Sequence, residues 1–162
     1  MFRNGLLRSQ SRLDLIAIAS FGGHLEELLH LSTAWEGRDC LYVTTEVAGA
    51  DAAMRTAATP FALVSDCHMG QFRKMIVCLR QIIALVRRHR PKCVVTTGAL
   101  PGLIMALVAR LSGAQAIWID SLANTDTLSG SGRLARWIVD RHLTQWPAVA
   151  RRGGTQYSGT LF

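Results

Sequence analysis

The 162-residue sequence has few acidic residues, and they are unevenly placed. It contains 11 Asp and Glu against 18 Lys and Arg, a formal net charge of +7. No acidic residue occurs between Asp66 and Asp120, but this segment holds Arg73, Lys74, Arg80, Arg87, Arg88, Arg90, Lys92 and Arg110. Because an ordinary solvated surface mixes both signs, we predict a basic face and a negatively charged partner: anionic lipid, nucleic acid or a phosphorylated substrate.

The sequence also lacks cysteine pairs and long apolar runs. The four cysteines form no C-x-x-C motif, and their spacing fits neither a zinc site nor a disulfide framework, so we expect buried, reduced thiols and no metal. They are Cys40, Cys67, Cys78 and Cys93. The longest apolar run, residues 99–109, contains a proline and is shorter than the ~20 residues of a membrane-spanning helix. Residues 1–12 lack the apolar segment of a signal peptide. The expectation is a soluble or peripheral protein.

What the sequence does contain is an alternation of apolar strand-length runs and amphipathic helical stretches. Such runs are typical of a parallel sheet that is covered on both faces. We predict an α/β fold with a single Rossmann-like, doubly wound parallel sheet over residues 13–162, preceded by a basic segment at 1–12. The expected strands are 13–20, 40–45, 61–64, 92–97 and 116–120, with short edge strands at 142–146 and 156–158. The expected helices are 24–35, 48–58, 71–89, 98–111 and 133–141.

Three loops would meet at the carboxyl ends of these strands, where this fold binds ligands. The first contains Ser20, Gly22, Gly23 and His24. Glycines allow close approach of a ligand, the following helix N-terminus favours an anion, and His24 could act as a base or donor. The alternative is a tight turn in which His24 merely caps the helix. The dinucleotide motif G-x-G-x-x-G is missing, which argues against a nicotinamide cofactor.

The other two loops carry hydroxyl groups. Thr97 and Gly98 precede a helix with proline in its first turn, which suits either an anion site or an ordinary helix start. Ser121 follows the apolar strand 116–120 and would line the ligand crevice or begin a turn. No Gly-x-Ser-x-Gly motif occurs, which argues against a serine hydrolase. The helix 71–89 combines an apolar stripe, typical of core packing, with a basic flank that could face anionic lipid headgroups.

Six segments, taken together and in order, resemble a known family. They are SFGGHLEEL (20–28), TTGALP (96–101), IDSLA (119–123), LSGSGRL (128–134), QWP (145–147) and YSGTLF (157–162). The pattern resembles the bacterial PssD-type exopolysaccharide glycosyltransferase subunits. It is also similar to the eukaryotic membrane-anchoring subunit of the dolichol-diphosphate N-acetylglucosaminyltransferase. The resemblance covers nearly the whole chain from Asp14 onward.

This resemblance implies the N-terminal half of a MurG-like transferase of the GT-B fold. The chain would bind the acceptor and recruit the complex to the membrane, and a separate subunit would bind the nucleotide sugar. The implied reaction is an inverting sugar transfer to a polyprenyl-diphosphate-linked glycan in polysaccharide biosynthesis, without cofactor or metal. The implied location is peripheral, on an anionic membrane surface at the cytoplasmic face of the bacterial inner membrane.

The resemblance also assigns roles to particular residues. His24 is the candidate general base, and Glu27, at an acidic position of the motif, is grouped with it as a residue that orients the loop. The acceptor diphosphate would be held by Ser20, Gly22, Gly23, Thr97, Gly98 and Ser121. Tyr157 and Phe162 are candidates for docking the partner subunit. Phe21 and Asn124 depart from the family pattern, which expects a small residue and an arginine there.

Three other functions compete with a half-enzyme. A non-catalytic membrane adaptor, which recruits and stabilises a complete catalytic partner, would tolerate Phe21 in the key loop. A small nucleotide-binding oxidoreductase would bind a dinucleotide, which the missing third glycine argues against. A nucleic-acid binder is disfavoured because the basic residues lack interleaved aromatic residues.

Overall fold

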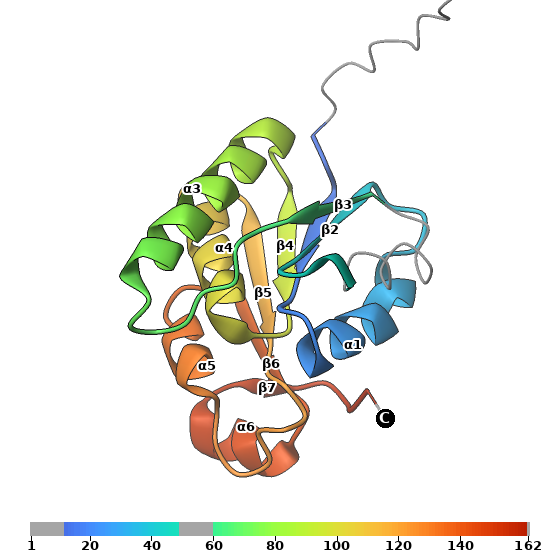
Figure 1. Cartoon of the computed structure of the whole chain (residues 1–162). Coiled ribbons are helices and arrows are strands. Elements are labelled where there is room, and N and C mark those ends of the chain that lie inside the picture. The colour runs from blue at the N-terminus through green and yellow to red at the C-terminus, as the bar shows by residue number, and fades with distance from the viewer. Residues whose placement is uncertain (1–11, 49–59, 162) are drawn as a thin grey trace, which may run out of the picture.

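The computed structural model describes residues 12–48 and 60–161, which form one sheet with helices on both faces (Figure 1). The strands are β1 (Leu15–Ile18), β2 (Cys40–Thr44), β3 (Phe61–Leu63), β4 (Cys93–Thr96), β5 (Gln115–Ile119), β6 (Arg141–Thr144) and β7 (Gln156–Tyr157). All adjacent pairs are parallel, in the order β3-β2-β1-β4-β5-β6-β7. The order reverses between β1 and β4, so the predicted doubly wound parallel sheet is confirmed.

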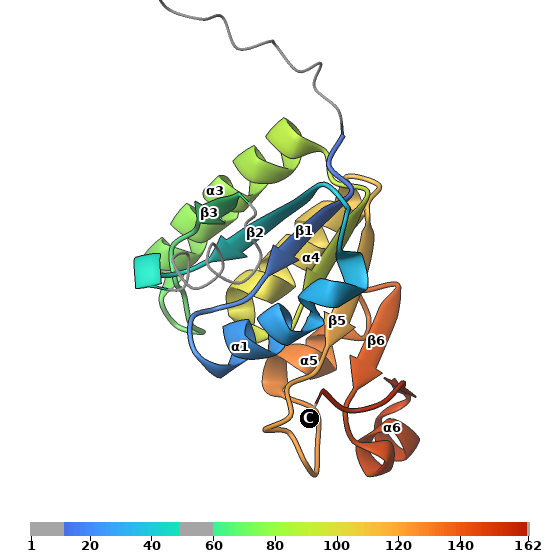
Figure 2. The same ribbon diagram turned by 90° about the vertical axis from the view of Figure 1, so that its right-hand side faces the viewer.

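Two apolar layers sandwich the central strands. Figure 2 shows α1 on one face of the sheet and α3 and α4 on the other. The helices are α1 (Gly23–His30), the 3-10 helix η1 (Leu31–Trp35), α3 (Phe72–His89), α4 (Ala99–Leu111), α5 (Gly130–Ala135) and α6 (Pro147–Gly153). On the α3 and α4 face, Ile82 and Met105 pack on Ile16 and Val94. On the α1 face, Leu28 packs in the cluster that contains Tyr42 and Val95.

The burial of β1 and β2 explains why their sequences are continuous apolar runs. Every residue of β1 and β2 is buried. Since successive side chains of a strand point to opposite faces, burial on both faces requires apolar residues at every position and not at alternate ones. Strand β1 lies inside the sheet and pairs with β4, the central strand, so the loop that follows β1 lies next to the loop that follows β4.

The C-terminal third differs from the prediction. The expected helix 133–141 is wrong: α5 begins one turn earlier, because the Ser129 hydroxyl accepts a hydrogen bond from the Gly132 amide at its N-terminus, and it ends at Ala135. Arg141 already belongs to β6. The segment 142–146, expected at an edge, contributes to β6, which lies inside the sheet between β5 and β7. Helix α6 was not predicted.

Other predicted elements agree with the structure within a few residues. The stretch 24–35 is helical throughout, but it changes from α-helix to 3-10 helix after His30. The predicted helix 48–58 falls almost entirely on residues 49–59, outside the described residues. Across the described ranges, no helix has both the length and the hydropathy that crossing a bilayer requires.

Candidate functional site

Two glycine-capped helices begin side by side where the strand order reverses. Gly22 precedes α1 with a φ of 103°, and Gly98 precedes α4 with a φ of 138°. Both values lie in the region that favours glycine. No side chain of the described residues caps either helix at these N-cap positions. Because β1 and β4 are adjacent and parallel, the positive ends of both helix dipoles lie at the same edge of the sheet and favour an anion there.

His24 lies directly against the second glycine loop. A Cβ atom added to Gly98 would be 2.6 Å from His24 Cδ2 and 2.7 Å from His24 Nε2, so the imidazole ring occupies the space that glycine leaves. Thr97 holds the backbone of His24 in place, since its hydroxyl donates to the His24 carbonyl oxygen at 2.5 Å. The structure therefore brings together His24, Thr97 and Gly98, three residues predicted for the site. His24 stays partly exposed.

Glu27 is a buried carboxylate that holds the third loop. Its side chain accepts hydrogen bonds from the Ser121 hydroxyl at 2.7 Å, the Leu122 amide at 3.1 Å and the Gln145 side-chain amide at 3.3 Å. Burying a charge in this way requires several donors. The donors come from residues more than 90 positions away in the sequence. Glu27 thus positions the loop after β5 against α1, and its carboxylate is fully occupied in doing so.

Asp120 forms a second buried carboxylate centre beside the first. It accepts hydrogen bonds from Trp118 Nε1 at 3.2 Å and from the Ser129 hydroxyl at 2.9 Å. A Cβ atom on Gly132 would lie only 2.6 Å from Asp120 Oδ1, so this close approach requires glycine. Asp120 therefore accounts for two residues of the LSGSGRL segment. The Ser129 hydroxyl donates to its carboxylate, and Gly132 leaves room for it. The sequence predicts Asp120, together with Ser121, only as a polar residue at the carboxyl end of the fifth strand, and not these carboxylate contacts.

Gln145 joins both carboxylate centres to the C-terminal segment. Its side-chain nitrogen donates to Glu27 Oε2 and to the Asp120 carbonyl oxygen at 3.2 Å, and its side-chain oxygen accepts from the Leu161 amide at 3.1 Å. Gln145 is 2% exposed. In the sequence, Gln145 stands out only as part of the QWP segment, and no local pattern predicts this role because its partners are distant in the sequence.

The remaining predicted residues are spread more widely. Ser20 is partly buried directly after β1 and its neighbour Ala19. Tyr157 lies in β7 at the edge of the sheet, exposed and separated from β1 by three strands. Phe162 lies outside the described residues. The departure Phe21 is exposed, and its amide donates to the Thr45 hydroxyl at 3.1 Å.

The cysteines are free and fit the prediction of buried thiols. Cys40, Cys67 and Cys78 are buried, and Cys93 is half-buried. Burial raises the pKa of Cys40 and of Cys78 to about 12. In the described part of the chain, no group of three His, Cys, Asp or Glu side chains is arranged to hold a metal ion.

Two exposed apolar surfaces accompany the site. A groove of about 390 Å³ lies on the α1 face of the sheet beyond η1, lined mainly by the apolar side chains Leu31, Trp35, Ile117, Ile119 and Leu143. The second surface is the outer side of α3, where Phe72, Ile76 and Leu79 are exposed at helical spacing among Arg73, Lys74 and Arg80. The buried stripe of α3 is formed by other residues, Cys78, Ile82 and Val86.

Sequence comparisons identify related proteins. The model of the family described as "Oligosaccharide biosynthesis protein Alg14 like" matches residues 62–161. The UDP-N-acetylglucosamine transferase subunit ALG14 of Eremothecium gossypii is 28% identical over 179 residues, which cover 93% of this chain and 80% of the relative. The subunit of the same name from Yarrowia lipolytica is 30% identical over 86 residues, 49% of this chain and 40% of the relative.

Solved structures share the fold at low sequence identity. MurG of Acinetobacter baumannii superposes with a TM-score of 0.68 at 12% identity, covering 83% of this chain and 42% of MurG. The UDP-N-acetylglucosamine 2-epimerase of Rickettsia bellii gives a TM-score of 0.68 at 12% identity, covering 93% of this chain and 45% of the epimerase. The chain thus spans less than half the length of these proteins, and it has the fold of the N-terminal half of a GT-B glycosyltransferase.

Proposed function

Because the chain belongs to the Alg14-like family of oligosaccharide biosynthesis proteins, we propose that it is the acceptor-binding and membrane-recruiting subunit of a two-component glycosyltransferase. The second subunit binds the nucleotide sugar. The reaction is an inverting transfer to a polyprenyl-diphosphate-linked glycan, at the cytoplasmic face of the bacterial inner membrane. The relatives named as UDP-N-acetylglucosamine transferase subunits support this function.

The observation that carries the proposal is the contact of His24 with Gly98 between two helix N-termini. The acceptor diphosphate binds where the two helix dipoles and the glycine loops meet. An acceptor hydroxyl beside the imidazole loses its proton to His24 as its oxygen attacks the donor sugar. The new glycosidic bond forms as the bond from the sugar to the donor phosphate breaks, and the nucleoside diphosphate leaves with the electron pair. A single displacement of this kind inverts the anomeric centre.

The loop around Ser121 completes the acceptor side of the site. Glu27 and Gln145 hold this loop in place and do not touch the reacting atoms. Their role is to keep the site preorganised, so that no side chain has to move as charge develops. Ser20, Gly22 and Gly23 supply the backbone that approaches the diphosphate, and Thr97 fixes His24 through its carbonyl group.

A second chain is needed to complete the enzyme. The chain spans 42% of MurG, and in the proposed enzyme the second chain supplies the donor-binding half. The apolar groove beyond η1 is a surface that such a partner can bury, because larger exposed apolar patches mark interaction sites. Tyr157, on the exposed edge strand, and Phe162 remain candidates for the same interface.

The outer side of α3 supports recruitment to a membrane. Its exposed apolar side chains can enter the headgroup boundary while the adjacent arginine and lysine side chains contact anionic lipid. Phe72 is 71% exposed, which is costly for so large an apolar side chain unless a partner covers it.

Sugar transfer by the purified two-subunit complex tests the proposal. Each subunit is assayed alone and with the other on a lipid-linked acceptor. We expect transfer only with both chains, and a decrease of about 10²-fold or more in the His24→Ala complex, the effect typical of losing a general base. His30→Ala, in the same helix, is the matched control. Transfer by one chain alone would contradict a split enzyme.

The adaptor function predicts a different result for the same variant. The exposed Phe21 in the key loop favours an adaptor, because it stands where the family pattern has a small residue. An adaptor leaves the chemistry to its partner, so the His24→Ala complex would keep full activity while still requiring the chain for membrane recruitment.

A further inference from the structure

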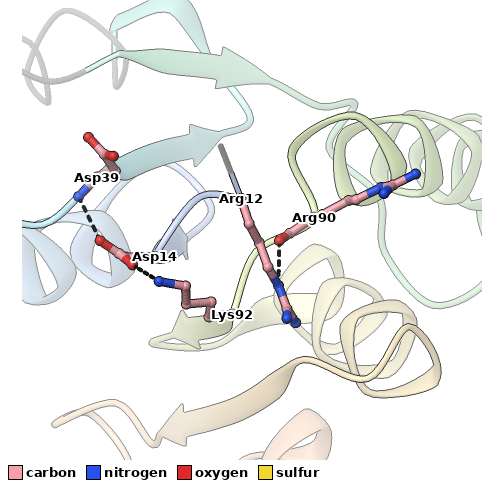
Figure 3. A network of polar contacts seen from close by, with 5 residues as sticks. All are labelled: Arg12, Asp14, Asp39, Arg90 and Lys92. Carbon is pink, nitrogen blue, oxygen red and sulfur yellow. Dashed lines mark hydrogen bonds and ion pairs between the residues drawn. The ribbon is translucent and has the colours of Figure 1, made fainter. Parts of the chain in front are cut away.

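Three arginines line a hollow at the edge of the sheet opposite the site. It has a volume of about 580 Å³ and is lined by Arg12, Val86, Arg87, Arg90, Pro91 and Ser112. We call it the arginine pocket. Arg12 precedes β1, Arg90 follows α3 and Ser112 follows α4, so the pocket lies at the amino ends of the strands. Figure 3 shows the Arg12 guanidinium beside the Arg90 carbonyl, to which its Nε donates at 3.0 Å.

The positive charge of this pocket is not neutralised by the described residues. Asp14, two residues after Arg12, is paired with Lys92 at 2.6 Å and also accepts from the Asp39 amide (Figure 3). The hydrogen bond from Lys92 lowers the pKa of Asp14, so it is ionised and engaged elsewhere. Within residues 12–48 and 60–161, neither Arg12, Arg87 nor Arg90 forms an ion pair.

The arginine side chains are not required to cap the helices that end there. At the end of α3, the Val86 and His89 carbonyl groups accept from the Arg90 and Leu13 amides. At the end of α4, the carbonyl groups of Val108, Ala109 and Arg110 likewise accept hydrogen bonds from the backbone amides that follow the helix. Of the pocket arginines, only Arg12 donates to a carbonyl group, that of Arg90. Among the described residues, the guanidinium groups of Arg87 and Arg90 therefore form no ion pair and cap no helix.

Arg90 is present in spite of a backbone conformation that favours glycine. Its φ of 45° and ψ of 57° place it in the left-handed region, at the position after a helix where glycine is most common. A side chain in this conformation is unfavourable compared with glycine. Strain of this kind is retained where the side chain has a use.

We propose that the arginine pocket binds a phosphate group with two or more negative charges, as in a phosphomonoester or a diphosphate. Guanidinium groups match phosphate oxygens in charge and in fork geometry. The ligand is either the headgroup of an anionic lipid or a soluble phosphate compound. This site is separate from the proposed acceptor site at the other end of the strands, and it does not depend on the proposed function.

Titration of the full chain with inorganic diphosphate tests the soluble source. The arginine Nε–H signals are followed by NMR in the unaltered protein and in Arg87→Gln and Arg90→Gly variants. Each variant is expected to weaken binding about five- to tenfold, as for a charged hydrogen bond in a partly exposed site. Arg152→Gln, on the exposed end of α6 outside the pocket and away from α3, removes the same charge and is expected to change the affinity less than twofold. Arg90→Gly also serves as a folding control, since it is expected to leave Tm unchanged or raise it.

Vesicles test the lipid source. Binding is compared between phosphatidic acid and phosphatidylglycerol at equal surface charge, because only the first has a phosphomonoester. A preference for phosphatidic acid that Arg87→Gln and Arg90→Gly abolish, and Arg152→Gln retains, supports the pocket even if free diphosphate does not bind. An equal effect of all three variants in both experiments overturns it, as does the absence of both diphosphate binding and phosphatidic acid preference.

Discussion

Gly98 is the residue on which the geometry of His24 depends most directly. Gly98→Ala would place a methyl group within 2.7 Å of the His24 ring and impose a φ of 138° on an alanine. Because small misplacements of a catalytic group are costly, we predict a decrease of about 10–100-fold in sugar transfer by the two-subunit complex. Gly113→Ala is the control, since Gly113 also has a positive φ but faces open space. Equal losses in both variants would show that backbone strain, and not His24, is responsible.

His142 makes the stability of the fold depend on pH. It is 8% exposed, its two ring nitrogens have no hydrogen-bond partner among the described residues, and it packs edge-on against Trp118. Burial lowers its pKa, and the smaller opposing effect of Asp120 does not reverse this. The unfolded chain therefore binds a proton at His142 more readily than the folded chain does, so the free energy of unfolding falls as pH decreases below about 6.5.

Thermal unfolding at pH 5.5 and 7.5 measures this effect. We expect a lower Tm at pH 5.5, and a smaller difference between the two pH values in His142→Phe, which keeps an aromatic ring and removes the titration. His89 has a pKa lowered by burial and by Arg88, so part of the pH dependence remains. An unchanged pH dependence in His142→Phe would rule out His142 as its source.

Some of the site could be predicted from the sequence, and the rest could not, for a physical reason. His24, Thr97 and Gly98 follow strands that were recognised by their apolar runs, so their meeting follows from the topology of a parallel sheet. Gln145 follows β6, a strand without such a run. Its contacts with Glu27 and Leu161 depend on how the last strands and the C-terminal segment pack, which no local pattern encodes.

At the scale of single elements, helix boundaries were predictable only where a local signal marked them. The Ser129 N-cap and its acceptance of the Gly132 amide start α5 earlier than the apolar pattern indicated. Helix α6 begins with Pro147 after Trp146, and proline at the first helical position is a recognised signal of a helix start. In contrast, α3 was predicted to within one residue, because its apolar spacing runs over 18 residues and ends before Pro91.

Helix α3 is also the element for which membrane binding makes a specific prediction. Its exposed Phe72 and Ile76 are one turn apart, beside Arg73 and Lys74. Since apolar burial and anionic attraction both contribute to binding, Phe72→Ser with Ile76→Ser is predicted to weaken vesicle binding about tenfold or more. Co-sedimentation with vesicles that contain phosphatidylglycerol measures it. Leu107→Ser on α4, another exposed apolar residue, is the control and is expected to bind like the unaltered chain.

At the scale of the whole molecule, the strand order explains why an apolar groove lies on the α1 face of the sheet. Right-handed crossovers from β3 onward carry the later helices to the α3 and α4 face, whereas α1 and η1 lie on the other face (Figure 2). The side chains of Ile117, Ile119 and Leu143 therefore line a groove on that face. The fold class was predictable from alternating strands and helices, but the groove follows from the order of the strands, which the sequence pattern does not specify.

If the partner subunit covers this groove, a charge placed in it must separate the two chains. Ile117→Lys would put an ammonium group among apolar side chains, and burying it unpaired under a partner costs several kcal/mol. We predict that co-purification of the two subunits falls at least about tenfold and that sugar transfer falls with it. Leu111→Lys, at the exposed end of α4 and outside the groove, is the matched control and is expected to retain both. A complex that forms normally with Ile117→Lys would place the partner on another surface, of which the edge strand with Tyr157 is the next to test. Substituting Tyr157 in the same assay then decides between the two faces.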